Sequence, residues 1–386
     1  MPRDAVKLTH PIEANLRAGH PWVFRDALSI PAHLGAGDVV DLLDRQGQFL
    51  ARGTIEPGSR LAFRVWTLRQ DEAVDAALLR RRLAAAAALR QEIVPADVTG
   101  FRLCHGENDH IPGLQCDLYD GIASLRTDGE LGVVWEERFV EAVEAVAAPR
   151  AVVVRNPRYE QPKVVRGAVP EEVVIAEGDR RFGVDILRGQ KTGFFLDQRD
   201  NRDRVARLAA GRSVLNCFAY TGGFSVAAAL HGAERVTTVD IAAPAVAAAE
   251  RNFALNALPT RGHRFLASDA FDVLNDEAAH PGRYDLIILD PPSFAPNRAS
   301  IPRAKKAYTR LNTLALRALP PGGWLATASC SSHIRESDLL DLLGAAASET
   351  GRQLTLAGIW GPGCDHPGRL GFPEGNYLNF ILARVG

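Results

Sequence analysis

The fold of this protein is decided by residues 214–224, which read VLNCFAYTGGF. Residues 214–218 are mostly apolar and predict a buried strand that ends at Phe218, and the two glycines that follow permit a tight turn. Similar runs occupy residues 235–240, 284–290 and 324–329, and segments with helical character lie between them. Continuous rather than alternating apolar runs are typical of a parallel sheet that is covered on both faces. The stretch therefore predicts a doubly wound α/β domain.

The α/β alternation begins near residue 183, and we predict one domain over residues 183–386. Residues 1–72 are expected to form a small β-rich domain, because short strand-like runs such as Val39–Leu43 alternate with Gly and Pro. Residues 73–182 are expected to form a central α+β module, in which a helix over residues 75–92 precedes several strands.

Composition excludes several classes of protein. The 386 residues carry 45 basic and 46 acidic side chains and are 46% apolar, which is typical of a globular chain with a sizeable core. No run of about 18 apolar residues predicts a membrane span, and Met1–Lys7 lacks the apolar core of a signal peptide. The five cysteines form no Cys-x-x-Cys pair, and Cys104, His105 and His110 fit a hairpin better than a metal site. We expect a cytoplasmic protein with no metal and no membrane partner.

Ligands of such sheets bind beyond the carboxyl ends of the strands. The first turn lacks the G-x-G-x-x-G spacing that admits a pyrophosphate, so it suits a nucleoside cofactor without phosphates. Asp240 ends the next strand and could accept hydrogen bonds from a ribose diol. Asp269 follows the third strand and could bind an adenine amino group.

The fourth strand ends in Asp290-Pro291-Pro292, a rigid corner where a methyl donor would meet a flat substrate. Together with the turn, Asp240 and Asp269, this corner predicts S-adenosylmethionine as the cofactor. The alternative is that the strand-end acids serve only as helix caps.

Several motifs resemble the bacterial 23S rRNA cytosine-C5 methyltransferases of the large-subunit methyltransferase I type, over nearly the whole chain. They are GHPWVF at 19–24, GE at 106–107, IPGL at 111–114, QKTGFFLDQR at 190–199 with Asn201 and Arg202, and ASCS at 328–331. The resemblance implies an N-terminal PUA domain, S-adenosylmethionine as cofactor, 23S ribosomal RNA as partner and 5-methylcytosine as product. It also implies that the QKTGFFLDQR segment closes over the cofactor.

Cys330 is the candidate nucleophile. Carbon 5 of cytosine is barely nucleophilic, and a thiolate that adds to C6 turns the ring into an enamine able to take a methyl group. The alternative is that Cys330 is a core residue, whereas Cys217, inside a strand, is expected to be a core residue or part of the cofactor wall. Asp290 would hold the N3 or N4 edge of the base. Ser293, where many RNA cytosine-C5 methyltransferases carry a second cysteine, leaves the proton acceptor unassigned.

The candidate residues form three sets. The catalytic set is Cys330 and Asp290. The cofactor-binding set is Phe195, Gln198, Asn216, Phe218, Tyr220, Thr221, Gly222, Asp240, Asp269, Ala270, Asp290 and Pro291. The RNA-binding set is a basic strip of Arg298, Arg303, Lys305, Lys306, Arg310, Arg317 and Arg335, with Phe294 or Tyr308 stacking on the flipped base.

Two other functions remain open. One is an exocyclic-amine methyltransferase that uses Asp290-Pro291-Pro292 to hold the amino group, although Ser293 replaces the aromatic residue usual after that proline pair. The other is a non-catalytic RNA-binding assembly factor that keeps the fold. A homodimer is also left open.

Overall fold

A computed structural model describes residues 4–295 and 297–386, so the first three residues of the Met1–Lys7 stretch lie outside it. These residues separate into two compact units. The first consists of residues up to Ala176 with Val184–Leu196 and Cys364–Gly375, and the second of Glu177–Gly183, Asp197–Gly363 and Asn376–Gly386. The chain passes between them in a two-stranded sheet of β12 (Val173–Glu177) and β13 (Arg180–Val184). Whether residues 1–72 and 73–182 are separate domains stays a prediction.

The amino-terminal part of the first unit contains a six-stranded sheet in the order β2-β6-β5-β4-β1-β3. Its elements are β1 (Ala5–Leu8), α1 (Glu13–Arg17), β2 (Trp22–Phe24), β3 (Leu28–Ser29), β4 (Val39–Leu43), β5 (Phe49–Ile55) and β6 (Leu61–Thr67). Buried and half-buried residues alternate along β4, as expected of a strand with one face on a core. Val23, Val40, Ile55 and Phe63 are fully buried in that core.

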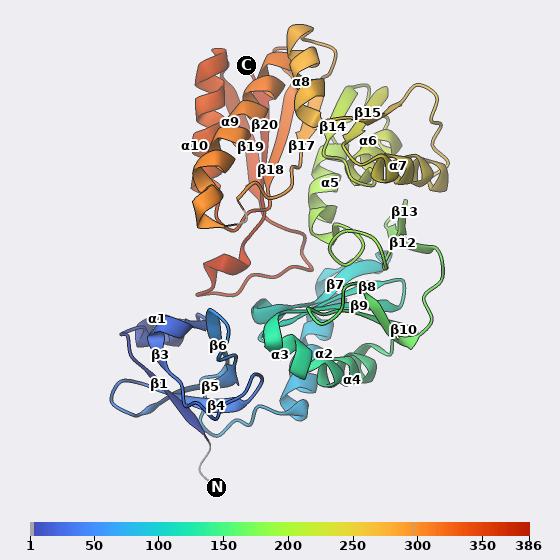
Figure 1. The fold of residues 1–386 in the computed structure, drawn as a ribbon. Coiled ribbons are helices and arrows are strands. Elements are labelled where there is room, and N and C mark those ends of the chain that lie inside the picture. The colour runs from blue at the N-terminus through green and yellow to red at the C-terminus, as the bar shows by residue number, and fades with distance from the viewer. Residues whose placement is uncertain (1–3, 296) are drawn as a thin grey trace. The chain divides into compact units, whose positions relative to one another are not determined.

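A second sheet of the first unit has five strands in the order β11-β10-β9-β8-β7. Its strands are β7 (Gly100–His105), β8 (Leu114–Tyr119), β9 (Ile122–Thr127), β10 (Ala151–Arg155) and β11 (Lys163–Gly167), and its helices are α2 (Ala76–Ile93), α3 (Gly129–Val134) and α4 (Glu136–Ala147). The carboxylate of Asp75 caps α2 by accepting a hydrogen bond from the amide of Leu78 at 2.9 Å. Helices α2 and α4 lie side by side (Figure 1).

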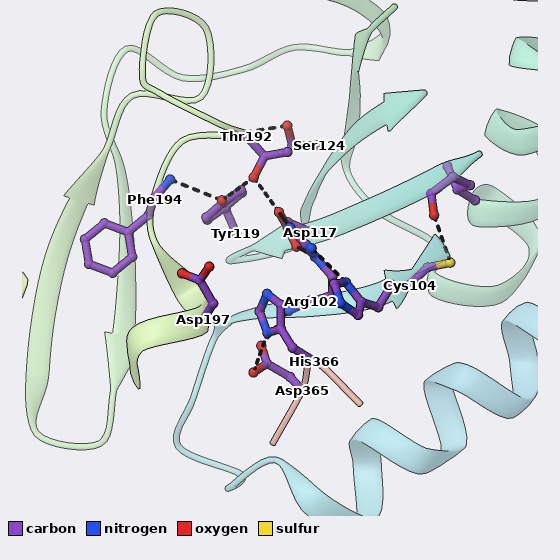
Figure 2. A network of polar contacts seen from close by, with 12 residues as sticks. Arg102, Cys104, Asp117, Tyr119, Ser124, Thr192, Phe194, Asp197, Asp365 and His366 are labelled. Carbon is purple, nitrogen blue, oxygen red and sulfur yellow. Dashed lines mark hydrogen bonds and ion pairs between the residues drawn. The ribbon is translucent and has the colours of Figure 1, made fainter. Parts of the chain in front are cut away.

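A buried polar network connects distant segments of the first unit (Figure 2). Arg102 on β7 donates two hydrogen bonds to Asp117 on β8, at 2.6 and 2.9 Å, and its backbone amide donates to Asp365 at 2.8 Å. The Thr192 hydroxyl donates to Asp117, so the Tyr119 hydroxyl, 2.8 Å away, must donate to Thr192. These contacts fasten the Val184–Leu196 and Cys364–Gly375 segments to the five-stranded sheet.

The second unit is built on a seven-stranded sheet in the order β16-β15-β14-β17-β18-β20-β19. Its strands are β14 (Ser213–Cys217), β15 (Arg235–Asp240), β16 (Arg264–Ala267), β17 (Leu286–Leu289), β18 (Trp324–Ser329), β19 (Leu354–Trp360) and β20 (Asn379–Val385). Its helices are α5 (Arg199–Ala206), α6 (Gly223–Leu230), α7 (Ala243–Leu255), α8 (Ala270–Ala279), α9 (Ile301–Ala318) and α10 (Glu336–Thr350). Helices α8, α9 and α10 pack in one group and α5, α6 and α7 in another (Figure 1).

The predicted α/β fold is confirmed, with two differences. The first five strands in that order are parallel, but β20 pairs antiparallel with both β18 and β19, so the sheet is mixed. The first strand ends at Cys217 rather than at Phe218, because Phe218 adopts a φ of 59°, which is incompatible with a strand. No helix in the part of the chain that the structure describes has both the length and the hydropathy of a membrane span.

Candidate active site

The turn after β14 has an unusual backbone. Phe218, Tyr220 and Gly222 all have positive φ values, of 59°, 48° and 78°. A side chain at Gly222 would also lie only 2.8 Å from the Cβ of Ala249 on α7, so glycine is required there for close packing. Left-handed conformations at two aromatic residues are costly and cluster at functional sites, which supports this turn as a binding loop.

Asp240 at the end of β15 holds this turn in place. One carboxylate oxygen accepts the amide of Tyr220 at 2.8 Å, and the other accepts the amide of Ala242 at 2.9 Å. Each carboxylate oxygen has two acceptor positions, so both can still accept a ribose hydroxyl. Asp240 does not cap α7, whose N-cap is Ala242. The alternative that all the strand-end acids are helix caps therefore fails at Asp240.

Asp240→Ala is expected to weaken S-adenosylmethionine binding by about 1–3 kcal/mol, because two backbone amides of the turn lose their acceptor and the proposed ribose contact is lost with it. Calorimetric titration measures this directly. Asp272→Ala, which removes an exposed acid from α8, is the matched control and should bind as the wild type does. Unchanged affinity in Asp240→Ala would remove Asp240 from the cofactor site.

At the end of β16, the strand-end acid does cap a helix, as the helix-cap alternative predicts. Asp269 is the N-cap of α8, and its carboxylate accepts the amide of Phe271 at 2.7 Å. Asp269 is exposed, so its other lone pairs remain open to a ligand, whereas the side chain of Ala270 is buried in the core. A role of Ala270 in binding would therefore involve its backbone.

One candidate was missed in the sequence. Ile241 follows Asp240 directly, and 74% of its surface is exposed. A large aliphatic side chain uncovered beside the proposed ribose acceptor fits the face of an adenine ring. The sequence signal was present: an isoleucine immediately after the strand-end acid, outside the strand.

Two other predicted residues, Asn216 and Thr221, connect the turn after β14 to the helices beside it. Asn216 is fully buried in β14 and donates to the Ser225 hydroxyl on α6 at 2.9 Å, and Ser225 also accepts from Thr238 at 2.8 Å. The backbone carbonyl of Thr221 accepts from Asn252 on α7 at 2.8 Å. These bonds hold the turn between α6 and α7.

Cys330 and the Asp290-Pro291 corner lie together. Cys330 directly follows β18, and its Sγ lies 3.7 Å from the carbonyl oxygen of Pro291. Its side chain is half-buried, whereas Cys104, Cys116 and Cys217 are fully buried. Burial raises the pKa of those three thiols well above the ordinary value, so they stay protonated. Cys217 is thus a core residue, as predicted.

Aromatic residues surround this corner, but they are not equally accessible. Phe294 is half-buried and packs on Tyr308 with ring centroids 4.9 Å apart. Tyr308 is fully buried, and burial raises the pKa of its hydroxyl. The suggestion that Tyr308 stacks on a flipped base is therefore wrong for this structure, since its ring is covered. Phe294 keeps that role as a prediction.

The QKTGFFLDQR segment divides between the units. Gln198 belongs to the second unit, where its side-chain Nε2 donates to the Asp290 carboxylate at 2.9 Å. Phe195 belongs to the first unit, where Lys191 lies 4.2 Å from its ring centroid, so its contact with a cofactor stays a prediction. Within residues 4–295 and 297–386, no group of three or more His, Cys, Asp or Glu side chains could hold a metal ion.

The described residues fit S-adenosylmethionine. Asp240 offers acceptors for a ribose, Ile241 offers an apolar face, and Asp269 offers an exposed carboxylate after the neighbouring parallel strand β16. These three residues are two acids and one apolar side chain, which suit a nucleoside that carries an amino acid rather than phosphate groups.

Two protein families match different parts of this chain. Residues 140–350 match the S-adenosylmethionine-dependent methyltransferase family, and residues 6–68 match the PUA-like domain. The chain is 35% identical to ribosomal RNA large subunit methyltransferase I of Pseudoalteromonas atlantica, with 97% of each chain covered, and 36% identical to that of Tolumonas auensis, also with 97% covered.

Solved structures show the same fold. A Streptococcus mutans protein described as a SAM-dependent methyltransferase matches with a TM-score of 0.87 at 22% identity, over 99% of this chain and 100% of that one. A protein described as a methyltransferase and crystallised with S-adenosylhomocysteine matches with a TM-score of 0.88 at 23% identity, over 100% of both chains. The chain belongs to the S-adenosylmethionine-dependent ribosomal RNA large subunit methyltransferase I family, has an amino-terminal PUA-like domain, and uses S-adenosylmethionine as its cofactor.

Proposed function

We propose that this protein methylates carbon 5 of a cytosine in 23S ribosomal RNA. The observation that carries the proposal is the position of Cys330, a half-buried thiol 3.7 Å from the carbonyl oxygen of Pro291. Relatives at 35% and 36% identity are named for methylation of large-subunit ribosomal RNA, which supports the substrate class.

Cys330 acts first in the proposed mechanism. Its thiolate adds to C6 of the cytosine, and the Sγ–C6 bond makes C5 nucleophilic. When bound, S-adenosylmethionine would supply an electrophilic methyl group to C5 by cleavage of its sulfonium–methyl bond and would leave as S-adenosylhomocysteine. A base then removes the C5 proton, and the Sγ–C6 bond breaks to restore the thiolate and the aromatic ring.

Asp290 holds the base during this sequence. Its carboxyl group is proposed to contact the N3 or N4 edge and so to stabilise the charge that grows on the ring as the thiolate adds. It stands between β17 and the proline pair, and the carbonyl oxygen of the adjoining Pro291 lies 3.7 Å from the Cys330 Sγ, which supports this role.

The cofactor would be held at the adjoining strand ends. Asp240 would accept from the ribose, Ile241 would cover one face of the adenine, and Asp269 would accept from its amino group. The turn of Phe218, Tyr220, Thr221 and Gly222 would contact the amino-acid end, and Asn216 and Pro291 would shape its walls.

The decisive experiment locates the methyl group. Ribosomal RNA from cells that lack the gene is incubated with the protein and isotope-labelled S-adenosylmethionine, digested to nucleosides and analysed by mass spectrometry. We expect the label in 5-methylcytidine. Label on an exocyclic nitrogen would instead support the amine methyltransferase alternative, and no heat on calorimetric titration with S-adenosylmethionine would support a non-catalytic assembly factor.

The basic strip along α9 is the proposed contact with RNA phosphates. Arg298, Arg303, Lys306 and Arg310 are exposed, but Lys305 pairs with Asp338 at 2.6 Å and Arg317 pairs with Glu349 at 3.1 Å. The strip therefore has fewer available charges than its sequence suggests, because acids of α10 neutralise part of it.

Replacing both Arg303 and Lys306 with Gln is expected to weaken RNA binding and to reduce the slope of log affinity against log salt by about 1.5, since each lost phosphate contact contributes about 0.7–0.9. Filter binding from low to high salt measures the slope. Arg251→Gln, an exposed cation on α7, is the matched control and should leave the slope unchanged. An unchanged slope in the double variant would exclude this strip from the RNA contact.

A further inference from the structure

A chain of three side chains leads to Asp290. Arg204 Nη1 donates to Asn201 Oδ1 at 3.1 Å, Asn201 Nδ2 donates to Gln198 Oε1 at 2.8 Å, and Gln198 Nε2 donates to Asp290 Oδ1 at 2.9 Å. Arg204 and Asn201 lie on α5, and Gln198 directly precedes that helix. Asp290 directly follows β17, and all four residues belong to the second unit.

The direction of this chain is fixed by chemistry. A guanidinium group can only donate, so Arg204 must face the oxygen of the Asn201 amide. The Asn201 nitrogen then faces Gln198, and it also donates to the carbonyl of Gly361 at 3.2 Å. Gln198 must therefore accept through its oxygen, which leaves its nitrogen to donate to Asp290. Turning either amide around would oppose donor to donor or acceptor to acceptor.

Burial makes the chain rigid and strong. Gln198 is 2% exposed and Asn201 is fully buried, so their bonds lie in a medium of low dielectric constant and polarise one another. Arg204 is half-buried, and its guanidinium lies 4.8 Å from the ring centroid of Trp360 on β19. The hydrogen-bond chain thus begins at Arg204, a cation held at the edge of the core. It ends at Asp290, the residue proposed to bind the cytosine.

We propose that Arg204, Asn201 and Gln198 are positioning residues that set the orientation and protonation pattern of Asp290. Because Gln198 donates to Oδ1, this oxygen is kept as an acceptor, and a proton shared with N3 of the base is directed to Oδ2. The proposal rests on the proposed function, in which Asp290 contacts the base. It gives Gln198 a role toward Asp290, whereas the sequence predicted only a contact with the cofactor.

Other groups near Asp290 bear on its protonation. The buried Tyr308 hydroxyl on α9 is influenced by the charges of both Asp290 and Cys330, which add to the rise in its pKa. Tyr308 therefore stays neutral, and Cys330 after β18 and, through the hydrogen-bond chain, Arg204 on α5 are among the ionisable groups near Asp290.

Gln198→Glu tests the proposal. A second carboxyl group 2.9 Å from the first shares one proton with it, and mutual repulsion raises the pKa of the pair. The protonated pair keeps the bond to Oδ1, and the doubly ionised pair loses it. We expect activity within about threefold of wild type near pH 6 and at least about tenfold lower near pH 8.5, because the ionised pair repels with the energy of more than one pKa unit. A pH-independent loss would overturn the proposal.

Arg204→Met extends the test to the far end of the chain. We expect kcat to fall about three- to tenfold, the equivalent of one hydrogen bond, with an unchanged Kd for S-adenosylmethionine. Arg204→Lys, which keeps a donor, should recover part of the loss, and Arg207→Met, at the exposed end of the same helix, should behave as wild type. A parallel loss of cofactor affinity in Gln198→Glu and Arg204→Met would assign the chain to the cofactor instead and overturn the proposal.

The two proposals fail in different ways. If wild-type product analysis shows a methyl group on nitrogen, the cytosine-C5 function fails, and the pH profile of Gln198→Glu still reports whether Gln198 acts on Asp290. If the product is 5-methylcytidine but the profile of Gln198→Glu parallels that of wild type, the function stands and the positioning chain fails.

Discussion

Cys330→Ala is expected to abolish methyl transfer to cytosine while leaving the Kd for S-adenosylmethionine within about twofold of wild type, a difference below about 0.5 kcal/mol. The thiolate supplies the only covalent activation in the proposed mechanism, so its loss should lower the rate by more than about 10³-fold, toward the barrier of an unactivated ring. Initial rates with labelled S-adenosylmethionine and ribosomal RNA measure the effect.

Trapping provides the second readout. An RNA that contains 5-fluorocytosine cannot release a proton from C5, so wild-type protein should remain covalently joined to it after methylation, and Cys330→Ala should not. Cys364→Ala, which removes the other half-buried thiol, is the matched control and should retain activity and trapping. Full activity in Cys330→Ala would falsify the covalent mechanism.

Arg102→Met is expected to destabilise the first unit by about 3–5 kcal/mol, because it leaves the Asp117 carboxylate buried without its ion pair. Asp117 is 1% exposed, and Arg102 supplies it with two hydrogen bonds as well as one to His105 Nδ1 at 2.9 Å. Hydrogen exchange of the β7, β8 and β9 peptides measures the effect, since local opening should become correspondingly more frequent.

The control for that loss is an exposed ion pair of the same module. Arg150 and Asp120 lie 2.6 Å apart, with more than half of the Arg150 side chain exposed. Arg150→Met should therefore cost no more than about 1 kcal/mol. If Arg102→Met were equally mild, the buried network would not be a source of stability.

The sequence predicted those parts of the second unit that depend on local pattern. The strands at 235–240 and 324–329 have the predicted bounds, because segments rich in β-branched and apolar residues end there at Asp240 and Ser329. The strand order and the antiparallel insertion of β20 were not predicted. They depend on pairings such as that of Ala326 with Leu382, which no local pattern encodes.

In the candidate site too, some features follow from local sequence pattern and others depend on tertiary contacts. The meeting of Cys330 with the Asp290-Pro291 corner could be predicted, because the carboxyl ends of neighbouring parallel strands share one edge. The bond from Gln198 to Asp290 joins residues 92 positions apart and depends on how two amide groups are turned. That orientation is set by tertiary hydrogen bonds, so only the structure reveals it.

The place of β20 has a consequence for synthesis. This strand lies between β18 and β19, so β19 has no neighbour in the sheet until residues 379–385 are available. The first unit likewise receives its Cys364–Gly375 segment late. A newly made chain should therefore stay incompletely assembled until residues 379–385 have left the ribosomal exit tunnel, which makes the chaperone dependence of its folding a property to measure.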